Sequence, residues 1–326
     1  MTAHTKSHKD ASQKLITTST VGMSYGTWLQ ERRKGIGGSE AAGLVPGLES
    51  YTTPYSIWAD KTGRINATPD NEAMRQGRDL EQYVADRWMD ATGKKCRKRN
   101  EIIRNPKYPF AHANVDRWVI GENAGLECKT VNALQESYFT DEFPNRYYGQ
   151  CVHYMAVTGA DRWYLSVVIL GRGYKHYVLE RDQGVIDALM SIEKDFWENY
   201  VETDTAPPPD GEAATSEAIN SIYSDGGDND EMVDLFGESS DIERYLYINK
   251  EIKELKNEQE EIKQRLKTKI GDAHGGTVDQ YRVTWSKQCR PRFNDKQFAK
   301  DHPDIDLDDY YSKSTSRIMK VKEVRR

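Results

Sequence analysis

The stretch that decides the fold is Asp116-Arg117-Trp118-Val119-Ile120, followed after Gly121-Glu122-Asn123-Ala124-Gly125 by Leu126-Glu127-Cys128-Lys129-Thr130-Val131. Two apolar runs around a glycine-containing turn predict a β-hairpin. Asp116 then starts one strand, and Glu127-Cys128-Lys129 lies within its neighbour. Because strand side chains alternate, Glu127 and Lys129 should share a face, with Leu126, Cys128 and Thr130 on the other. An acid and an ammonium would then project together, although an ordinary solvated strand face has the same pattern.

The sequence around this hairpin alternates between helical and strand-like patterns. Residues 73–91 carry Met74, Leu80, Val84 and Trp88 near helical spacing, and Glu81 lies on or beside that apolar stripe. A second helix is expected from Pro144 to Thr158, then strands over 163–170 and 174–179 and a helix over 183–200. This order predicts an α/β or α+β domain.

Three carboxylates, Glu81, Asp116 and Glu127, are the candidate metal ligands. Burial of Glu81 beside Val84 and Trp88 requires a cationic partner. Three acids about 4 Å apart would repel by roughly 4 kcal/mol per pair at an effective dielectric of 20, so a cluster needs divalent metal or protonation. Oxygen donors favour Mg²⁺ or Mn²⁺, and the backbone carbonyl of Cys128 is a further candidate ligand. Alternatively, Glu81 turns outward and pairs with Arg78 or Arg87.

Such a site predicts phosphodiester hydrolysis. A bound metal ion lowers the pKa of water and neutralises phosphate oxygens, and Lys129 can orient the attacking water or stabilise the developing charge.

A series of ordered motifs resembles the YqaJ and phage lambda exonuclease family of PD-(D/E)XK nucleases. It covers about residues 25–182 and consists of Gly35-Ile36-Gly37-Gly38-Ser39-Glu40, Gly77 with Glu81, Pro109-Phe110 leading to Asp116, Glu127-Cys128-Lys129, and Tyr147 with Gln150. The resemblance implies a restriction-endonuclease-like α/β core with a mixed sheet between helices. It implies that Glu81, Asp116 and Glu127 bind metal, that Lys129 is catalytic, and that Gln150 and Tyr147 assist on the next helix.

A separate candidate site is the segment from Arg32-Arg33-Lys34 to Ser39. Gly37-Gly38 lets the backbone approach a phosphate, and Ser39 opens a helix whose amides attract anions. The alternative is a plain serine cap after a glycine turn. The resemblance implies that an arginine and Ser39 bind a terminal 5′-phosphate. Both Arg32 and Arg33 are candidates, and the spacing from Trp28 favours Arg32.

Composition limits the other possibilities. The 326 residues carry a net charge of −6 and four cysteines, without zinc-ligand spacing or a membrane-length apolar run, so we expect a soluble intracellular protein. The resemblance implies the cytoplasm of a bacterium or of a phage-infected host cell. Thirteen acids and no Lys or Arg lie between Val201 and Glu243. We divide the chain into a disordered leader (1–22), a nuclease domain (23–204), an acidic linker (205–240) and a helical arm with a small α+β accessory domain (241–326).

The functional hypothesis is a Mg²⁺-dependent exonuclease that digests linear double-stranded DNA from its ends. By resemblance it uses two metal ions, which Mn²⁺ can replace, and degrades 5′ to 3′ to leave tails for a single-strand annealing protein. A structure-specific or internally cutting endonuclease and a non-catalytic DNA-binding scaffold stay open. The resemblance suggests a trimer, whereas the Tyr245–Leu266 helix, with its 3-4 apolar spacing, could set another assembly or dock the annealing protein. No membrane partner is expected.

Overall fold

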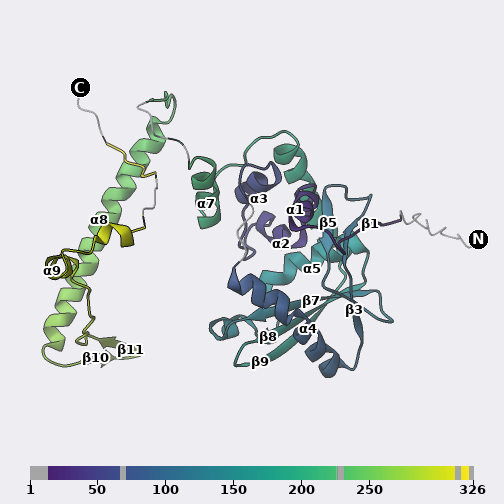
Figure 1. Cartoon of the computed structure of the whole chain (residues 1–326), viewed down its shortest axis with the longest axis horizontal. Helices are drawn as coiled ribbons and strands as arrows, with labels where there is room; N and C mark the ends of the chain where they lie inside the picture. Colours follow the sequence, from purple (N-terminus) through teal and green to yellow (C-terminus); the bar gives the residue numbers. More distant parts are fainter. Residues whose placement is uncertain (1–13, 67–70, 225, 227–230, 313–316, 323–326) are drawn as a thin grey trace, which may run out of the picture. The chain divides into compact units, whose positions relative to one another are not determined.

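The central sheet of the first unit carries the predicted hairpin. The computed structural model describes residues 14–66, 71–224, 226, 231–312 and 317–322, and the chain divides into two units between Tyr223 and Ser224 (Figure 1). The five strands lie in the order β3-β6-β7-β8-β9. Their bounds are β3 Cys96–Lys98, β6 Arg117–Val119, β7 Ala124–Val131, β8 Arg162–Ile169 and β9 Gly173–Glu180.

The sheet is mixed. β7 pairs in parallel with β8, and the other neighbours pair antiparallel. The β6–β7 register sets Arg117 opposite Leu126 and Trp118 opposite Gly125. Gly125 is required there, because a Cβ atom would lie 2.2 Å from the Trp163 ring. The hairpin prediction is confirmed.

Helices cover both faces of this sheet, as expected. Helix α4, Glu72–Thr92, and helix α5, Asn145–Thr158, both pack against β7 and β8 (Figure 1). Asn71 caps the start of α4, and Gly93, at φ 69°, ends it in the left-handed conformation. Trp88 of α4 packs with Leu126 and Tyr164, whereas Leu165 and Val167 pack with Phe139 on the other face.

A second sheet, ordered β1-β4-β5-β2, supports the glycine-rich segment. Its strands are β1 Ile16–Ser19, β4 Glu101–Arg104, β5 Ala111–Asn114 and β2 Ile36–Gly37. The prediction of a disordered leader over 1–22 is wrong for Ile16–Ser19, which pair antiparallel with β4 and gain ladder hydrogen bonds. Residues 1–13 of that predicted leader lie outside the described residues.

The remaining helices of the first unit surround these two sheets. They are α1 Tyr25–Arg33, α2 Gly38–Ala41, α3 Pro54–Lys61, α6 Gln183–Phe196 and α7 Ala213–Ile222. Three shorter helical turns are η1 Ala42–Leu44, η2 Ala133–Tyr138 and the π-helical η3 Trp197–Val201.

The prediction of an acidic linker over 205–240 is wrong for Ala213–Ile222, which form helix α7. This helix packs against α3 and buries Ala218. The hydroxyl of its Thr215 forms a hydrogen bond of 2.8 Å with the hydroxyl of Thr53. Glu217 is the one charged residue within Ala213–Ile222, so this segment can bury a face that the strongly acidic sequence around it cannot. The first unit therefore extends to Tyr223, beyond the predicted domain boundary at 204.

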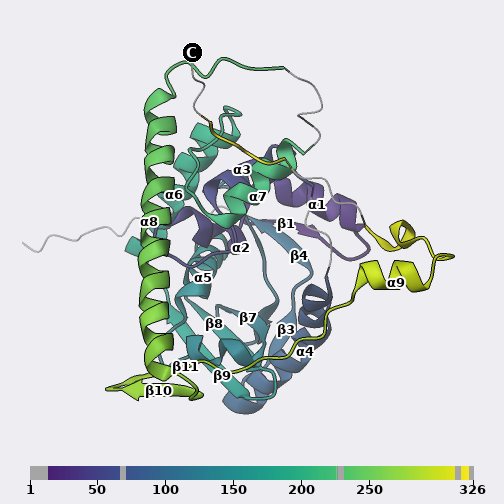
Figure 2. The same ribbon diagram turned by 90° about the vertical axis from the view of Figure 1, so that its left-hand side faces the viewer.

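The second unit, which begins at Ser224, contains the predicted long helix and small α+β elements. Helix α8 runs without interruption from Ser239 to Ile270 (Figure 2). The strands β10 Gly275–Val278 and β11 Tyr281–Thr284 form an antiparallel pair, followed by α9 Asp295–Asp301 and η4 Leu307–Tyr310. The predicted fold class, a mixed sheet flanked by helices with this C-terminal addition, is confirmed.

Candidate active site

The β6–β7 hairpin brings Asp116 against the middle of β7. Asp116 directly precedes β6, and its Oδ2 accepts a hydrogen bond of 2.9 Å from the backbone N–H of Cys128. Glu127, which precedes Cys128 on β7, is only 3% exposed. The hairpin thus holds two acids from distant sequence positions beside each other.

Glu127 uses its two carboxylate oxygens differently. Its Oε1 accepts a hydrogen bond of 2.8 Å from Nε2 of Gln150 and lies 2.6 Å from Nζ of Lys129. Its Oε2 is buried and has no hydrogen-bond partner. A buried anionic oxygen without a partner is costly, so this atom marks a position where a cation would be stabilising.

The electrostatics of the site follow from burial and the paired acids. Burial, followed by the charge of Glu127, raises the pKa of Asp116 well above its usual range. Burial opposes protonation of Lys129, but Glu127 and then Asp116 outweigh it, so the pKa of Lys129 is raised. Lys129 is therefore an ammonium at neutral pH, able to donate hydrogen bonds and unsuited to accept a proton.

Helix α5 supplies the side chains that surround Glu127. Gln150 Nε2 also donates to the Tyr154 hydroxyl at 2.9 Å, which fixes the amide between that phenol and Glu127. The Tyr147 ring lies 5.3 Å from Lys129 Nζ and stacks against Phe139. Gln150 and Tyr147 thus lie where the sequence prediction placed them, on the helix that faces Glu127 and Lys129.

Glu81 differs from the prediction. It forms an ion pair with the buried guanidinium of Arg117, and Lys98 Nζ lies 3.7 Å away. The physical reason is the origin of Glu81 on α4, which packs against the Leu126 side of β7, whereas Glu127 points toward α5. The cation that this acid requires is supplied by the protein.

The donor set was compared with the needs of a divalent metal ion. Within the described residues, no three His, Cys, Asp or Glu side chains are arranged to hold one ion, so the predicted closed set of three carboxylates is not observed. The pair Asp116 and Glu127 fits such an ion, because both are hard oxygen donors and Glu127 Oε2 has no other partner. Glu81 and the Cys128 carbonyl stay predictions as further ligands.

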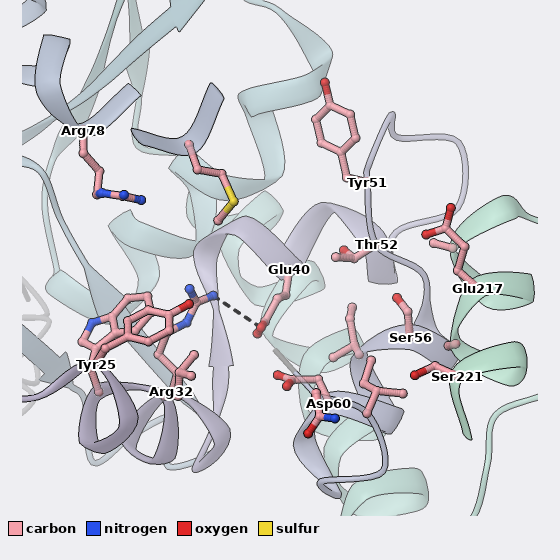
Figure 3. A pocket seen from close by; sticks show the side chains of 18 residues that line it. Tyr25, Arg32, Glu40, Tyr51, Thr52, Ser56, Asp60, Arg78, Glu217 and Ser221 are labelled. Atoms are coloured by element: carbon pink, nitrogen blue, oxygen red, sulfur yellow. Dashed lines mark ion pairs between the residues drawn. The ribbon is translucent and has the colours of Figure 1, made fainter. Parts of the chain in front are cut away.

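The second predicted site lies around α1 and α2. Arg32 Nη2 donates to Ser39 Oγ at 3.3 Å and lies 3.5 Å from Glu40, and its guanidinium stacks 4.8 Å from the centre of the Trp28 ring. Trp28, Arg32 and Glu40 line a cavity of about 780 Å³ that Tyr25 and Arg78 also border (Figure 3). The arrangement presents an arginine and an aromatic ring to the same open space.

The structure separates the two arginine candidates. Arg33 points away from Ser39, with Nε 3.3 Å from Asp60 and Nη2 donating to the Ile65 carbonyl at 2.9 Å. Arg32 is the arginine beside Ser39. The expectation that Arg33 contacts the same phosphate as Ser39 is not supported by this geometry.

Two glycine contacts join the Ser39 segment to the helix that carries Gln150. A Cβ atom on Gly38 would lie 2.5 Å from the ring of Tyr154, and one on Gly149 would lie 3.0 Å from the backbone of Ala42. Glu40 closes the glycine segment by accepting the Gly37 N–H at 2.7 Å, and Lys61 pairs with Glu40 at 2.7 Å. The two candidate sites therefore rest on one packed framework.

Sequence reasoning missed two residues of the candidate active site. Arg117 follows Asp116 directly, and the requirement of Glu81 for a cation was the signal that could have identified it. Tyr154 lies four residues after Gln150, hence on the same helical face, which is a weaker signal. His153, predicted to have no chemical role, is fully buried and pairs with Glu193 at 2.7 Å.

Comparison with known proteins places the chain in a family. Residues 27–161 match the YqaJ-like viral recombinase domain. The chain is 36% identical over 288 residues to the uncharacterized protein YqaJ of Bacillus subtilis (strain 168), which covers 87% of this chain and 90% of the relative. The chain therefore belongs to the YqaJ family.

Two solved structures show a weaker similarity. An alkaline exonuclease from Laribacter hongkongensis is 20% identical, with a TM-score of 0.46 over 55% of this chain and 93% of the other. A phage related exonuclease from Haemophilus somnus 129PT is 14% identical, with a TM-score of 0.43 over 55% and 100%. Among the described residues, no helix combines the length and apolar character needed to span a membrane.

Proposed function

We propose that the protein is a Mg²⁺-dependent exonuclease that hydrolyses linear double-stranded DNA from its ends. The observation that carries this proposal is the environment of Glu127. One of its oxygens is held by Lys129 and Gln150, and the other is buried without a partner beside Asp116. This is the charge distribution expected of a site that binds a hard divalent cation next to a fixed ammonium.

Each side chain has a distinct role in the proposed reaction. Asp116 and Glu127 would hold the ion, with Glu81 or the Cys128 carbonyl as a further ligand. When bound, such an ion would polarise the phosphate and lower the pKa of water; the family resemblance implies two ions, which Mn²⁺ could replace. Lys129, kept charged by its carboxylate neighbours, donates to the phosphate oxygens or the attacking water and stabilises the developing charge.

Gln150 and Tyr147 position these groups. Gln150 holds Glu127 by its Oε1, which leaves Oε2 for the ion, and its bond to Tyr154 prevents the amide from rotating. Tyr147 bounds the ammonium of Lys129 with an aromatic face. Neither residue needs to gain or lose a proton in this scheme.

The cavity beside Arg32 supports end recognition. A terminal 5′-phosphate placed between Arg32 and Ser39 would receive charge-assisted hydrogen bonds, and the Trp28 ring offers a face for the terminal base. A 5′-to-3′ direction follows from this placement. The product would be a 3′ single-stranded tail, which suits an annealing protein in the recombination reactions that the family name describes.

The direct test uses four DNA substrates in parallel. Linear duplex with a 5′-phosphate, the same duplex with a 5′-hydroxyl, nicked circles and covalently closed circles are incubated with Mg²⁺, Mn²⁺ or EDTA. We expect mononucleotide release from the phosphorylated linear duplex only with metal, slower release from the 5′-hydroxyl form, and intact closed circles. Cleavage of closed circles would establish an endonuclease instead, and absence of any cleavage would leave a DNA-binding scaffold.

Paired variants test the site itself. Glu127→Gln keeps the shape and removes the charge, and Lys129→Ala removes the ammonium, so each should abolish cleavage while far-UV circular dichroism stays unchanged. Lys175→Ala is the matched control, because its exposed amine pairs only with the exposed Asp141 at 3.1 Å, and it should retain full activity. Activity in Glu127→Gln close to that of the unmodified chain would refute the proposed role.

A further inference from the structure

Helix α8 carries an apolar stripe that the other described elements of the second unit do not cover. None of its residues, Ser239 to Ile270, is buried within the described part of the chain. Exposure of its apolar residues remains large, 43% at Ile252, 64% at Leu255 and 41% at Ile262. A solvated helix of this length with so many exposed large aliphatic side chains indicates an interaction surface.

The stripe follows a heptad repeat with few interruptions. With Tyr245 as position a, the a and d positions within the stretch Tyr245–Leu266 are Tyr245, Ile248, Ile252, Leu255, Gln259, Ile262 and Leu266. All are apolar except Gln259. The 3-4 spacing is that of a coiled-coil seam, in which each apolar side chain packs into a hole on a partner helix. A single polar residue at position a is the kind of residue that fixes the register of such a pair.

The charges beside the seam select the partner and its direction. Positions g of the first two heptads are Glu251 and Glu258, and the e positions five residues later are Lys256 and Lys263. In a parallel, in-register pair of identical helices, each of these glutamates faces a lysine of the other copy. In an antiparallel pair, g edges face each other and e edges face each other, so Lys256 and Lys263 would face an edge that carries lysines and no acid.

The ion pairs of the single chain do not compete strongly with this arrangement. Lys263 lies 3.3 Å from Glu260, and Arg244 lies 3.9 Å from Glu251, with all four side chains about half exposed. Exposed pairs of this kind contribute little to stability. Exchange for pairs across a buried apolar seam is therefore favourable, because the seam itself supplies the main gain in free energy.

We infer that α8 is a homotypic, parallel coiled-coil element, and that its partner is α8 of a second copy of this chain with Gln259 opposite Gln259. Both Ser239 ends then lie at the same end of the coil, so the connections to the two nuclease units leave it in the same direction. This surface is separate from the proposed active site and does not depend on nuclease activity.

Site-specific disulfide formation tests the register in the full-length protein. A single cysteine is introduced at Gln259 (Gln259→Cys) or at Asn257 (Asn257→Cys), which is the outward-facing position f, in a Cys289→Ser background that removes the exposed native thiol. Under mild oxidation we expect most of Gln259→Cys, and little of Asn257→Cys or the background protein, to form a disulfide-linked dimer. Equal or absent cross-linking at the two positions would overturn the inference.

Charge reversal tests the direction and the identity of the partner. Glu251→Lys with Glu258→Lys makes both edges cationic and should strongly reduce cross-linking through Gln259→Cys. Lys256→Glu with Lys263→Glu makes both edges anionic and should do the same. A mixture of the two proteins should restore it, as should all four substitutions in one chain.

Contacts between nuclease units do not affect disulfide formation at Gln259→Cys. Multi-angle light scattering would report any oligomer, whichever surface forms it, whereas the Gln259→Cys disulfide reports α8 alone. If the charge-reversed proteins cross-link as well as the original, the helices do not pair in the proposed parallel arrangement. Nuclease activity of the same samples, measured separately, is expected to persist in every α8 variant at saturating DNA, so failure of either proposal can be recognised without the other.

Discussion

Replacing Asp116 by asparagine should make the metal-free protein more stable while abolishing cleavage. Asparagine keeps an oxygen that can accept the Cys128 N–H, a bond of 2.9 Å, but it removes one of two buried carboxylates. Burial and then Glu127 raise the pKa of Asp116, so the folded state favours its protonated form. An acid of this kind stabilises the fold below its unfolded pKa of about 3.9 and loses that contribution as the pH rises through its folded pKa.

The size of the stability change can be estimated from the charges at the site. Two carboxylates about 4 Å apart repel by roughly 4 kcal/mol at an effective dielectric of 20, and Lys129 offsets part of this for Asp116. We expect Asp116→Asn to raise the free energy of unfolding by about 1–2 kcal/mol at pH 7 in EDTA. In a domain of this size, that corresponds to a rise in Tm of roughly 2–8 °C.

Addition of metal should make the native protein more stable than Asp116→Asn, which reverses the order of stability expected in EDTA. If the native site binds Mg²⁺ with a Kd of about 1 mM, then about 10 mM Mg²⁺ adds RT ln 11, or about 1.4 kcal/mol, to the free energy of unfolding. Asp116→Asn lacks one ligand and should gain much less.

The assay is thermal unfolding of both proteins in EDTA, Mg²⁺ and Mn²⁺, followed by tryptophan fluorescence. Six of the seven tryptophans lie in the first unit, where Trp88 and Trp163 are fully buried, and the seventh is the exposed Trp285 of the second unit, so the change in signal reports mainly the first unit. Asp90→Asn, which removes an exposed carboxylate from α4, is the control and should change neither Tm nor the response to metal. Destabilisation of Asp116→Asn in EDTA, or an equal response of both proteins to Mg²⁺, would refute the reasoning.

Three further predictions concern the surroundings of the site. Gln150→Ala should lower kcat about 10- to 100-fold in a mononucleotide-release assay, since Glu127 loses the donor that orients it; an unchanged kcat would argue against a positioning role. Arg33→Ala should cost about 1–2 kcal/mol in urea unfolding, through its lost contacts to Asp60 and Ile65, yet retain the preference for 5′-phosphorylated ends. Burial opposes protonation of His153, but Glu193 outweighs it and raises its pKa, so this contribution to stability is complete below about pH 6.5 and is lost as the pH rises through the raised value. The urea midpoint should therefore fall as the pH rises above about 6.5 in the native chain, and it should fall less in His153→Gln.

Local periodicity made the hairpin and its chemistry predictable. Alternation along β7 requires Glu127 and Lys129 to share one face whatever the rest of the chain does, and the structure confirms this sharing. The helix boundaries of α4 and α5 were similarly close, because Gly93 and Gly159 end them by adopting φ 69° and 74°. These features depend on residues near one another in sequence.

Features that depend on distant packing were not predictable in the same way. The orientation of Glu81 depends on Arg117, which is 36 residues away and becomes buried only when β6 joins the sheet. The strand at Ile16–Ser19 pairs with an edge that β4 offers; its β-branched residues suit a strand, but a segment of four residues does not identify its partner. Helix α7 becomes part of the first unit through contacts with α3, which composition alone could not reveal.

Packing between α2 and α5 has a consequence for the proposed reaction. Gly38 lies against Tyr154, and Tyr154 holds the Gln150 amide that orients Glu127, so few flexible parts separate the Arg32 side of the molecule from the carboxylate pair. Close packing of this kind transmits displacement instead of absorbing it. A terminal phosphate fixed at Arg32 would therefore lie at a nearly constant distance from the bond to be cut. That constancy is what release of one nucleotide at a time requires, and it gives a physical reason for the two glycines at the α2–α5 contact.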